Sequence, residues 1–320
     1  MRIPMSSPDL TAAEIEAVNQ VLQTPYLSIG PRIAEFEARF AEYVGVRRAV
    51  GVSSGTAGLH LGVIAGGVGE GDLVISTPFS FVASANVILY ERAIPIFVDV
   101  EERTGNIDPL LVADAARDLS RGGERARRWL PPAVRSSQAG GRRLKAVLPV
   151  HAFGQPADMD AIGDIARQYD LAVIEDACEA LGAEYKGRRI GASSQCVAVF
   201  AFYPNKQMTT GEGGMMVTDR DDWDALFRSL RNQGRDVFDA WLNHSRLGYN
   251  YRLAEMSAAL GLAQLGRIEE LLSRRERVAQ WYNTRLEDVE GARIPYLATT
   301  TTRMSWFVYV VRLAPQIDRR

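Results

Sequence analysis

Short apolar runs alternate with segments of helical pattern from residue 46 to about residue 230, and this alternation constrains the fold more than any other feature of the chain. The predicted strands are Ala49–Ser53, Leu73–Ser76, Ile94–Val98, Ala146–Val150, Ala172–Glu175, Val197–Phe202 and Met215–Thr218. The predicted helices between several of them are Ala57–Gly66, Val82–Glu91, Met159–Tyr169 and Asp222–Asn232. Continuously apolar strands joined by helices are typical of a mostly parallel sheet with helices on both faces. The sequence therefore predicts a three-layer α/β fold.

Helical patterns also flank this region on both sides. They are Thr11–Leu22, Pro31–Val44 and one long helix at Leu253–Leu286. After the long helix, Ser305–Leu313 has the pattern of a strand. We expect a large domain over residues 1–250, N-terminal helices included. Residues 251–320 are expected to hold the long helix and the start of a smaller α+β domain.

Composition excludes several classes of function. The 320 residues are 47% hydrophobic, which is enough for a large core, and the net charge of −2 gives no general attraction to nucleic acid or to an anionic membrane. No apolar run reaches transmembrane length, and the N-terminal residues lack the apolar core of a signal peptide. Cys178 and Cys196 have no metal or redox spacing, and the three histidines are widely separated. We expect a cytoplasmic protein without a metal site.

The segment 119–145 is unusually basic. It carries seven arginines and Lys145 against the single acid Glu124, together with Gly-Gly and Pro-Pro pairs. One interpretation is a solvated, mobile insertion loop. The other is a contact with a phosphate-bearing ligand or a nucleic acid. The sequence leaves both open.

Lys206 is the first candidate for chemistry. Only three of the 37 basic residues are lysines, and Lys206 lies on a turn between an apolar strand and a glycine-rich loop. Lysine can lose its proton in a desolvated site and attack a carbonyl, whereas arginine cannot. We therefore interpret Lys206 as a Schiff-base lysine that holds pyridoxal phosphate (PLP), against the alternative of a surface lysine in a turn.

Asp176 ends a buried strand, at the edge where open α/β sheets bind ligands. A carboxylate there can pair with the protonated ring nitrogen of PLP and keep the ring cationic. The alternatives are a helix N-cap and a structural ion pair.

Two further turns follow predicted strands. Ser53–His60 offers helix N-terminal amides, a glycine and hydroxyls, which suit a phosphate, although Ser and Thr also form ordinary helix caps. Phe81 can stack on a cofactor ring or simply pack in the core. His60 and His151 are interpreted as packed or loop residues. Phosphate turn, aromatic ring, strand-end Asp and turn Lys occur in this order, each after a strand, and the set is more specific than any one of them.

These motifs resemble the PLP-dependent sugar aminotransferases of the DegT–StrS family, which have the fold type I (aspartate aminotransferase-like) architecture. The motifs that carry the resemblance are Ser54–Ala57, His151–Asp160, Glu175–Gly182, Tyr203–Lys206 and Leu247–Arg252. The resemblance implies a set of cofactor-binding residues, namely Ser54, Gly55, Thr56, Phe81, Asp176, Glu179, Lys206 and Asn250.

Within this set, the resemblance implies that Lys206 bonds to PLP and Asp176 pairs with the ring nitrogen. Asn250 is implied to reach the cofactor phosphate of the second subunit of a homodimer. Two positions depart from the family. Ala201 replaces a frequent phosphate-binding Ser, and Glu179 stands where Gln or His usually lies near the phenolic oxygen of PLP. Family members also continue beyond the point where this chain ends, so we expect an incomplete small domain.

The expected reaction moves an amino group from an amino acid, with glutamate as the expected donor, to a keto group on a nucleotide-linked deoxysugar. Two alternatives stay open at this stage. One is a PLP aminotransferase that acts on a cyclitol or an amino acid. The other is a regulatory protein that binds PLP without turnover.

Overall fold

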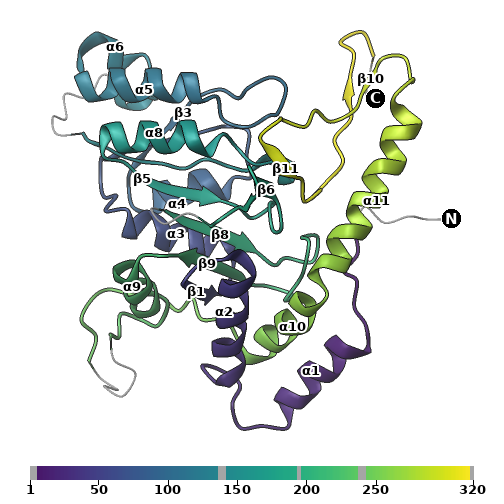
Figure 1. Cartoon of the computed structure of the whole chain (residues 1–320). Helices are drawn as coiled ribbons and strands as arrows, with labels where there is room; N and C mark the ends of the chain where they lie inside the picture. Colours follow the sequence, from purple (N-terminus) through teal and green to yellow (C-terminus); the bar gives the residue numbers. More distant parts are fainter. Residues whose placement is uncertain (1–5, 136–141, 193–195, 237–242, 318–320) are drawn as a thin grey trace.

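The computed structural model describes residues 6–135, 142–192, 196–236 and 243–317. A seven-stranded sheet forms its centre, with the strand order β1-β9-β8-β5-β4-β2-β3 (Figure 1). The strands are β1 (Arg48–Val52), β2 (Leu73–Ser76), β3 (Ile94–Phe97), β4 (Leu144–Val147), β5 (Ala172–Asp176), β8 (Val197–Ala201) and β9 (Gly214–Thr218). All pairings are parallel except those of β9, which runs antiparallel to both β1 and β8. The predicted mostly parallel sheet is confirmed.

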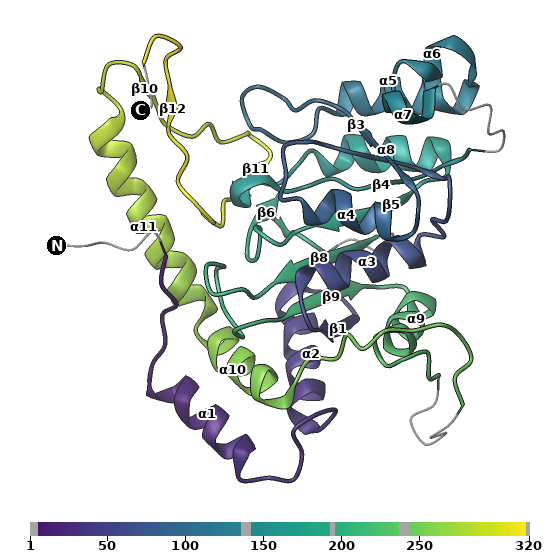
Figure 2. The same cartoon turned by 180° about the vertical axis from the view of Figure 1, so that it is seen from behind.

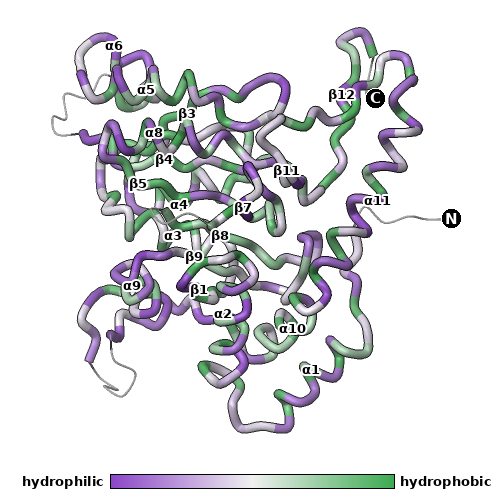
Figure 3. The backbone as a smooth tube through the Cα atoms, viewed as in Figure 1, coloured by the Kyte–Doolittle hydropathy of each residue, from purple (hydrophilic) through white to green (hydrophobic). Residues whose placement is uncertain are grey.

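Helices cover both faces of the sheet (Figures 1 and 2). One face carries α3 (Gly55–Ala65), α4 (Ala83–Tyr90) and α9 (Asp221–Arg231); the other carries α2 (Pro31–Val44), α5 (Pro109–Arg121), α8 (Met159–Tyr169) and α10 (Glu255–Gly266). Along β9, Met215 and Val217 pack on the α2 side, whereas Met216 packs on the α3 side. Hydrophobic positions concentrate in the strands of the sheet, whereas helices such as α9 carry many hydrophilic positions (Figure 3). The three-layer α/β prediction is confirmed.

A buried carboxylate joins the N-terminal part of the chain to α10. Glu255, at the start of α10, is 1% exposed and accepts hydrogen bonds from the backbone N–H groups of Gly30, Arg32 and Ile33. These N–H groups lie at the first turn of α2, where a helix has no internal acceptors. Glu255 therefore caps α2 and positions it against the sheet.

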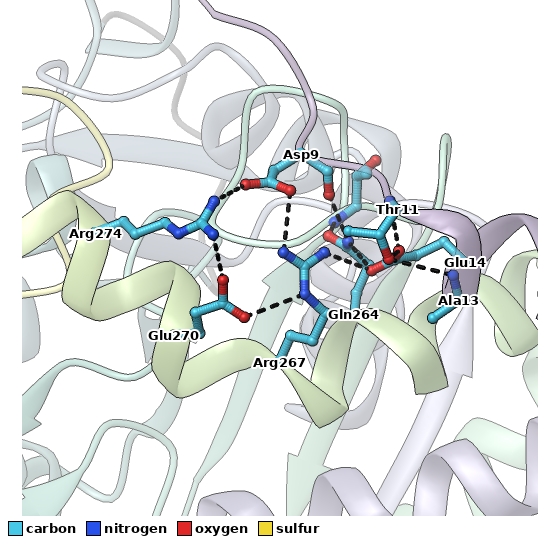
Figure 4. A network of polar contacts seen from close by, with 9 residues as sticks. Asp9, Thr11, Ala13, Glu14, Gln264, Arg267, Glu270 and Arg274 are labelled. Carbon is cyan, nitrogen blue, oxygen red and sulfur yellow. Dashed lines mark hydrogen bonds and ion pairs between the residues drawn. The ribbon is translucent and has the colours of Figure 1, made fainter.

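The predicted single helix Leu253–Leu286 is wrong in one respect, because it is two helices. The first is α10, and the second is α11 (Ile268–Leu286), which runs along one side of the molecule (Figure 1). Between them Arg267 has φ −112° and ψ 7°, and its guanidinium pairs with Asp9, Glu14 and Glu270 (Figure 4). The contacts with α1 (Ala12–Leu22) and the segment before it hold Arg267 where the helix breaks. Such long-range pairing carries no signal in the local pattern.

The predicted strand Ser305–Leu313 is also wrong, since only Arg312–Leu313 (β12) is extended and paired, with β10 (Ala292–Arg293). Ser305 and Phe307 instead donate their backbone N–H groups to Gly154 and Phe153, and Trp306 has a left-handed φ of 50°. A further strand, β11 (Thr301–Arg303), pairs with β6 (Glu184–Tyr185), which also pairs with β7 (Arg188–Arg189). The chain beyond α11 therefore lies against the large sheet domain. The division at residue 250 stays a prediction.

The basic segment is not simply a loop. It contains the end of α5, then α6 (Gly123–Arg127) and α7 (Pro132–Arg135), and the strand β4 begins at Leu144. Leu130 is buried in the core beneath α5, and Arg128 pairs with the buried Asp118 at 2.7 Å. The prediction of a mobile loop also covered residues 136–141, which lie outside the described residues.

Within the described part of the chain, no helix combines the length and the apolar character needed to span a membrane.

Candidate active site

A cavity of about 760 Å³ lies at the carboxyl ends of the parallel strands. Its walls come from the segments that follow β1, β2, β4, β5 and β8. This is the edge at which open α/β sheets bind ligands. Seven of the eight residues predicted to bind a cofactor line the cavity, and they are Ser54, Gly55, Thr56, Phe81, Asp176, Glu179 and Lys206. The eighth, Asn250, is exposed, bridges to Asn232 and does not line it.

Lys206 reaches into this cavity from the turn after β8. Its side chain is 14% exposed, and its Nζ lies 3.8 Å from Glu179 Oε1 and 4.1 Å from the centre of the Phe307 ring. The guanidinium of Arg275, on α11, donates to the backbone carbonyl of Lys206 at 2.9 Å. Lys206 is therefore a mostly buried lysine held from two sides, and this rules out the alternative of a surface lysine in a turn.

Asp176 is 6% exposed and lies on the floor of the cavity. Its Oδ2 accepts a hydrogen bond from Ser84 Oγ at 2.6 Å, and its Oδ1 accepts one from the Cys178 backbone N–H at 3.1 Å. Within the described part of the chain, no Lys, Arg or His side chain lies within 4 Å of this carboxylate. The structural ion pair considered for Asp176 is therefore not formed here, and the carboxylate faces the cavity.

The preceding residue, Glu175, points to the opposite side of β5. Its carboxylate accepts from Cys196 Sγ and lies 3.1 Å from His151 Nε2. Because His151 Nδ1 accepts a hydrogen bond from the Ala157 N–H, the ring hydrogen is on Nε2. The Nε2–H group therefore donates a hydrogen bond to Glu175. His151 is fully buried, and neither histidine singled out in the sequence lines the cavity. The interpretation of His60 and His151 as packed residues agrees with this placement.

The turn before α3 serves as a cap and as a cavity wall. Ser54 Oγ accepts from the Ala57 N–H at 3.0 Å, which is an ordinary N-cap, while Gly55 and Thr56 line the cavity. A Cβ on Gly55 would lie only 2.8 Å from Ala201 Cβ and from Cys178 Sγ. Glycine is therefore required for the close approach of this turn to β8, and the first amides of α3 stay at the cavity.

Phe81 is 76% exposed although it lines the cavity, so it does not pack in the core. Phe79, two residues earlier, is 46% exposed and packs edge-on against Phe153. A large exposed ring at a cavity wall is available for a ligand or a partner surface. Stacking of Phe81 on a cofactor stays a prediction.

Several further residues at the cavity were not predicted, and neither was Arg275, which contacts the Lys206 carbonyl without lining the cavity. Phe153, at the left-handed φ of 58°, and Asn205 lie within motifs that the resemblance already used, so a signal was present for both. Asn205 Oδ1 is buried without a hydrogen-bond partner. Phe307 and Arg275 gave no signal, because they come from the C-terminal segment and α11, far along the chain from Lys206.

Glu179 is the second carboxylate deep in the cavity. Its Oε2 accepts from the Phe153 N–H at 2.9 Å, and its backbone carbonyl accepts from Ser305 Oγ. Burial raises the pKa of Glu179, and the nearby ammonium of Lys206 acts in the opposite direction. Burial also raises the pKa of the neighbouring Cys178 thiol.

Within the described residues there is no group of His, Cys, Asp and Glu that could hold a metal ion.

The fold has three layers around a mostly parallel sheet. One cavity brings together a mostly buried lysine, a helix N-terminus and a strand-end carboxylate that has no cationic partner among the described residues. This combination is typical of fold type I transaminases. The chain belongs to the DegT/DnrJ/EryC1/StrS aminotransferase family, whose sequence model matches residues 8–320. The predicted family, fold class and enzyme class are confirmed. The regulatory alternative without turnover is not supported.

Several proteins are similar over nearly the whole chain. GDP-perosamine synthase of Caulobacter vibrioides is 41% identical over 315 residues, which are 98% of this chain and 77% of the relative. The Bacillus subtilis spore coat polysaccharide biosynthesis protein SpsC is 36% identical, covering 97% of this chain and 76% of SpsC. Among solved structures, DesV of S. venezuelae has a TM-score of 0.83 at 35% identity, over 95% of this chain and 75% of DesV. A Streptococcus pneumoniae aminotransferase in a PLP form has a TM-score of 0.83 at 26% identity, over 98% of this chain and 78% of that protein.

Proposed function

We propose that this enzyme uses PLP to transfer an amino group from an amino acid, with glutamate as the expected donor, to a keto group on a nucleotide-linked deoxysugar. The observation that carries the proposal is Asp176. A carboxylate that is 6% exposed and has no cationic partner among the described residues costs free energy unless a ligand supplies positive charge. The protonated ring nitrogen of PLP is such a ligand.

The other residues of the cavity also fit PLP. The amides at the start of α3 suit its phosphate, because helix N-terminal N–H groups are unpaired and favour anions. Gly55 keeps this turn close to β8, since a Cβ there would clash. The buried, unpartnered Oδ1 of Asn205 offers one more acceptor in the wall. Phe81 would stack on the ring and Lys206 would bind the cofactor through Nζ.

When bound, PLP supplies an electron sink that stabilises negative charge at the carbon next to the amino group. The chain supplies the proton transfers and the orientation. Lys206 Nζ would move the proton to and from the α carbon of the donor, because it is the only lysine or arginine nitrogen in the described cavity wall. Asp176 would hold the ring nitrogen protonated through charge. Ser84 and the Cys178 N–H fix the orientation of that carboxylate.

The proposed enzyme is a homodimer in which Asn250 completes the site of the partner. Phe81 and Tyr203 line the cavity and are 76% and 52% exposed, so the wall is open to solvent beside them. Asn250 is exposed and outside the cavity of its own chain. Both features support a site that a second chain covers.

The nucleotide-linked substrate rests on the similarity to GDP-perosamine synthase. The test incubates the purified protein with PLP, glutamate and a panel of nucleotide-linked keto-deoxysugars, guanine nucleotides first, with mass spectrometry of the products. Lys206→Ala is the control. We expect one sugar to gain an amine with the wild-type protein alone. Amination of a cyclitol ketone or a keto acid, with none of any sugar, would overturn the substrate assignment.

A further inference from the structure

Glu179 and Lys206 form a pair within the cavity that positions a proton acceptor beside the reactive amine. Glu179 Oε1 lies 3.8 Å from Lys206 Nζ, and both side chains are mostly buried, at 22% and 14% exposed. The Phe307 ring covers the ammonium at 4.1 Å. No other carboxylate of the described residues lies within 4 Å of Nζ.

Glu179 is held in this position from several sides. The Phe153 N–H fixes Oε2, so that Oε1 points toward Lys206. Ser305 Oγ and Gln207 Nε2 both donate to the Glu179 backbone carbonyl. The contacts come from three separate segments, after β4, after β8 and near the C-terminus, and together they fix the carboxylate geometry.

We propose that Glu179 is the proton acceptor of Lys206, taking the proton that Nζ must lose before it bonds to PLP and returning it when that bond is broken. This inference rests on the proposed function. In the step, one N–H bond of the ammonium breaks and one O–H bond forms on Glu179, leaving an amine and a carboxylic acid. No electrons are transferred, and no other reactant is needed.

The electrostatic setting favours this exchange. Burial disfavours the charged form of Glu179, so this carboxylate takes up a proton more readily than it would in water. The titratable and charged groups that face Glu179 are Lys206, Asp176 and Cys178. Burial raises the pKa of Glu179 and the Asp176 charge raises it further, while the Lys206 ammonium lowers it. The carboxyl is therefore a stronger base than an exposed Glu.

The experiment follows the addition of PLP to the cofactor-free protein, by absorbance and by borohydride trapping, between pH 5 and pH 9. The test variant is Glu179→Gln, which keeps an acceptor for the Phe153 N–H and introduces the residue that the family often has here. Glu16→Gln is the control, because Glu16 is exposed on α1 and does not line the cavity.

For the wild-type protein, we expect the rate of bond formation to fall at acid pH as Glu179 becomes protonated, at a pH above the ordinary value of 4.5. Glu179→Gln should react about 100-fold more slowly near neutral pH, the lower range for a positioned acid–base group, and its rate should rise with pH across the whole range, because only solvent can then take the proton from Nζ. Glu179→Asp should retain the limb, and Glu16→Gln should show the wild-type pH profile.

The outcomes separate the two proposals. If Glu179→Gln adds PLP at the wild-type rate or faster, or with the wild-type pH profile, then Glu179 is not the proton acceptor. If the wild-type protein traps no PLP on Lys206 at any pH, the proposed function itself fails. Circular dichroism and the melting temperature of each variant show whether a slow rate reflects misfolding. Should Glu179→Gln misfold, an acid limb missing from Glu179→Asp would also refute the proposal.

Discussion

Glu14→Gln tests the network that holds the break between α10 and α11 (Figure 4). The Glu14 carboxylate is 1% exposed and accepts four hydrogen bonds. The donors are Thr11 N–H, Thr11 Oγ–H, Gln264 Nε2 and Arg267 Nη1, at 2.7, 2.5, 2.8 and 3.0 Å. A glutamine has one acceptor oxygen, and its NH₂ group would face donors. The substitution therefore leaves buried donors unpaired and removes the charge that pairs with Arg267.

The expected loss follows from the pKa. Burial alone would raise the pKa of Glu14, but the hydrogen bonds from Thr11, Gln264 and Arg267 outweigh it and lower the pKa from 4.5 to about 2. Such a difference between the unfolded and folded chain corresponds to about 3 kcal/mol at neutral pH. We therefore expect Glu14→Gln to lower the melting temperature by roughly 5 °C.

The pH dependence gives a sharper test. Because the folded pKa is lowered, the stability from ionised Glu14 is complete above pH 4.5 and is lost as the pH falls toward 2. The difference in unfolding free energy between wild type and Glu14→Gln should shrink by about 1 kcal/mol between pH 7 and pH 4. Urea unfolding at both pH values measures it. Glu16→Gln is the control, since Glu16 is exposed on the same helix and, among the described residues, its carboxylate accepts a hydrogen bond from Gln20 alone. An equal effect of the two substitutions, or a difference independent of pH, would refute the reasoning.

Four further predictions concern the site and the basic segment. Borohydride reduction should trap a phosphopyridoxyl group on the peptide of Lys206, and a label on Lys145 or Lys186 would contradict the assignment. Asp176→Asn should bind PLP but turn over roughly 10- to 100-fold more slowly, since a lost charge-assisted bond costs about 1.5–3 kcal/mol; near-normal single-turnover rates would make Asp176 structural. Mixing inactive Lys206→Ala and Asn250→Ala chains should partly restore activity, because one site of the mixed dimer keeps both native residues; a mixture as inactive as its parents would place Asn250 outside the partner site. Replacing the arginines of α6 and α7 by Gln should leave cofactor binding and the Michaelis constant for the sugar nucleotide unchanged at low and high salt, whereas a salt-sensitive rise in that constant would show a substrate contact.

The position of the basic segment distinguishes its two interpretations. The sequence left open a phosphate contact for residues 119–145, but α6 and α7 precede β4 and lie at the amino-terminal edge of the sheet. They lie at the far end of the molecule from α11 (Figures 1 and 2). The cavity is at the carboxyl ends of the strands, and none of the described residues of this segment lines it. The structure therefore favours a role outside the active site.

The sequence by itself determined the strands of the central sheet, most of the helices and the order of the candidate site residues. Strand Leu73–Ser76 and helices Met159–Tyr169 and Pro31–Val44 were predicted with the observed bounds, because apolar periodicity is a local property. Lys206, Asp176 and the turn at Gly55 were expected to lie together because each follows a strand and parallel strands bring their carboxyl ends to one edge, and all three line the cavity.

Only the tertiary structure decided the contacts between distant segments. Arg267 breaks a continuous helical pattern because its partners lie on the N-terminal side of the chain, and Ser305–Phe307 leave their strand pattern to bond with the Phe153 turn. Arg275 and Phe307 reach Lys206 from α11 and the segment after it. The local preference of a residue for helix or strand is worth a few tenths of a kcal/mol, whereas a buried hydrogen bond contributes about 1 kcal/mol or more. Contacts with distant segments can therefore override the local preference, and the local sequence pattern gives no sign of them.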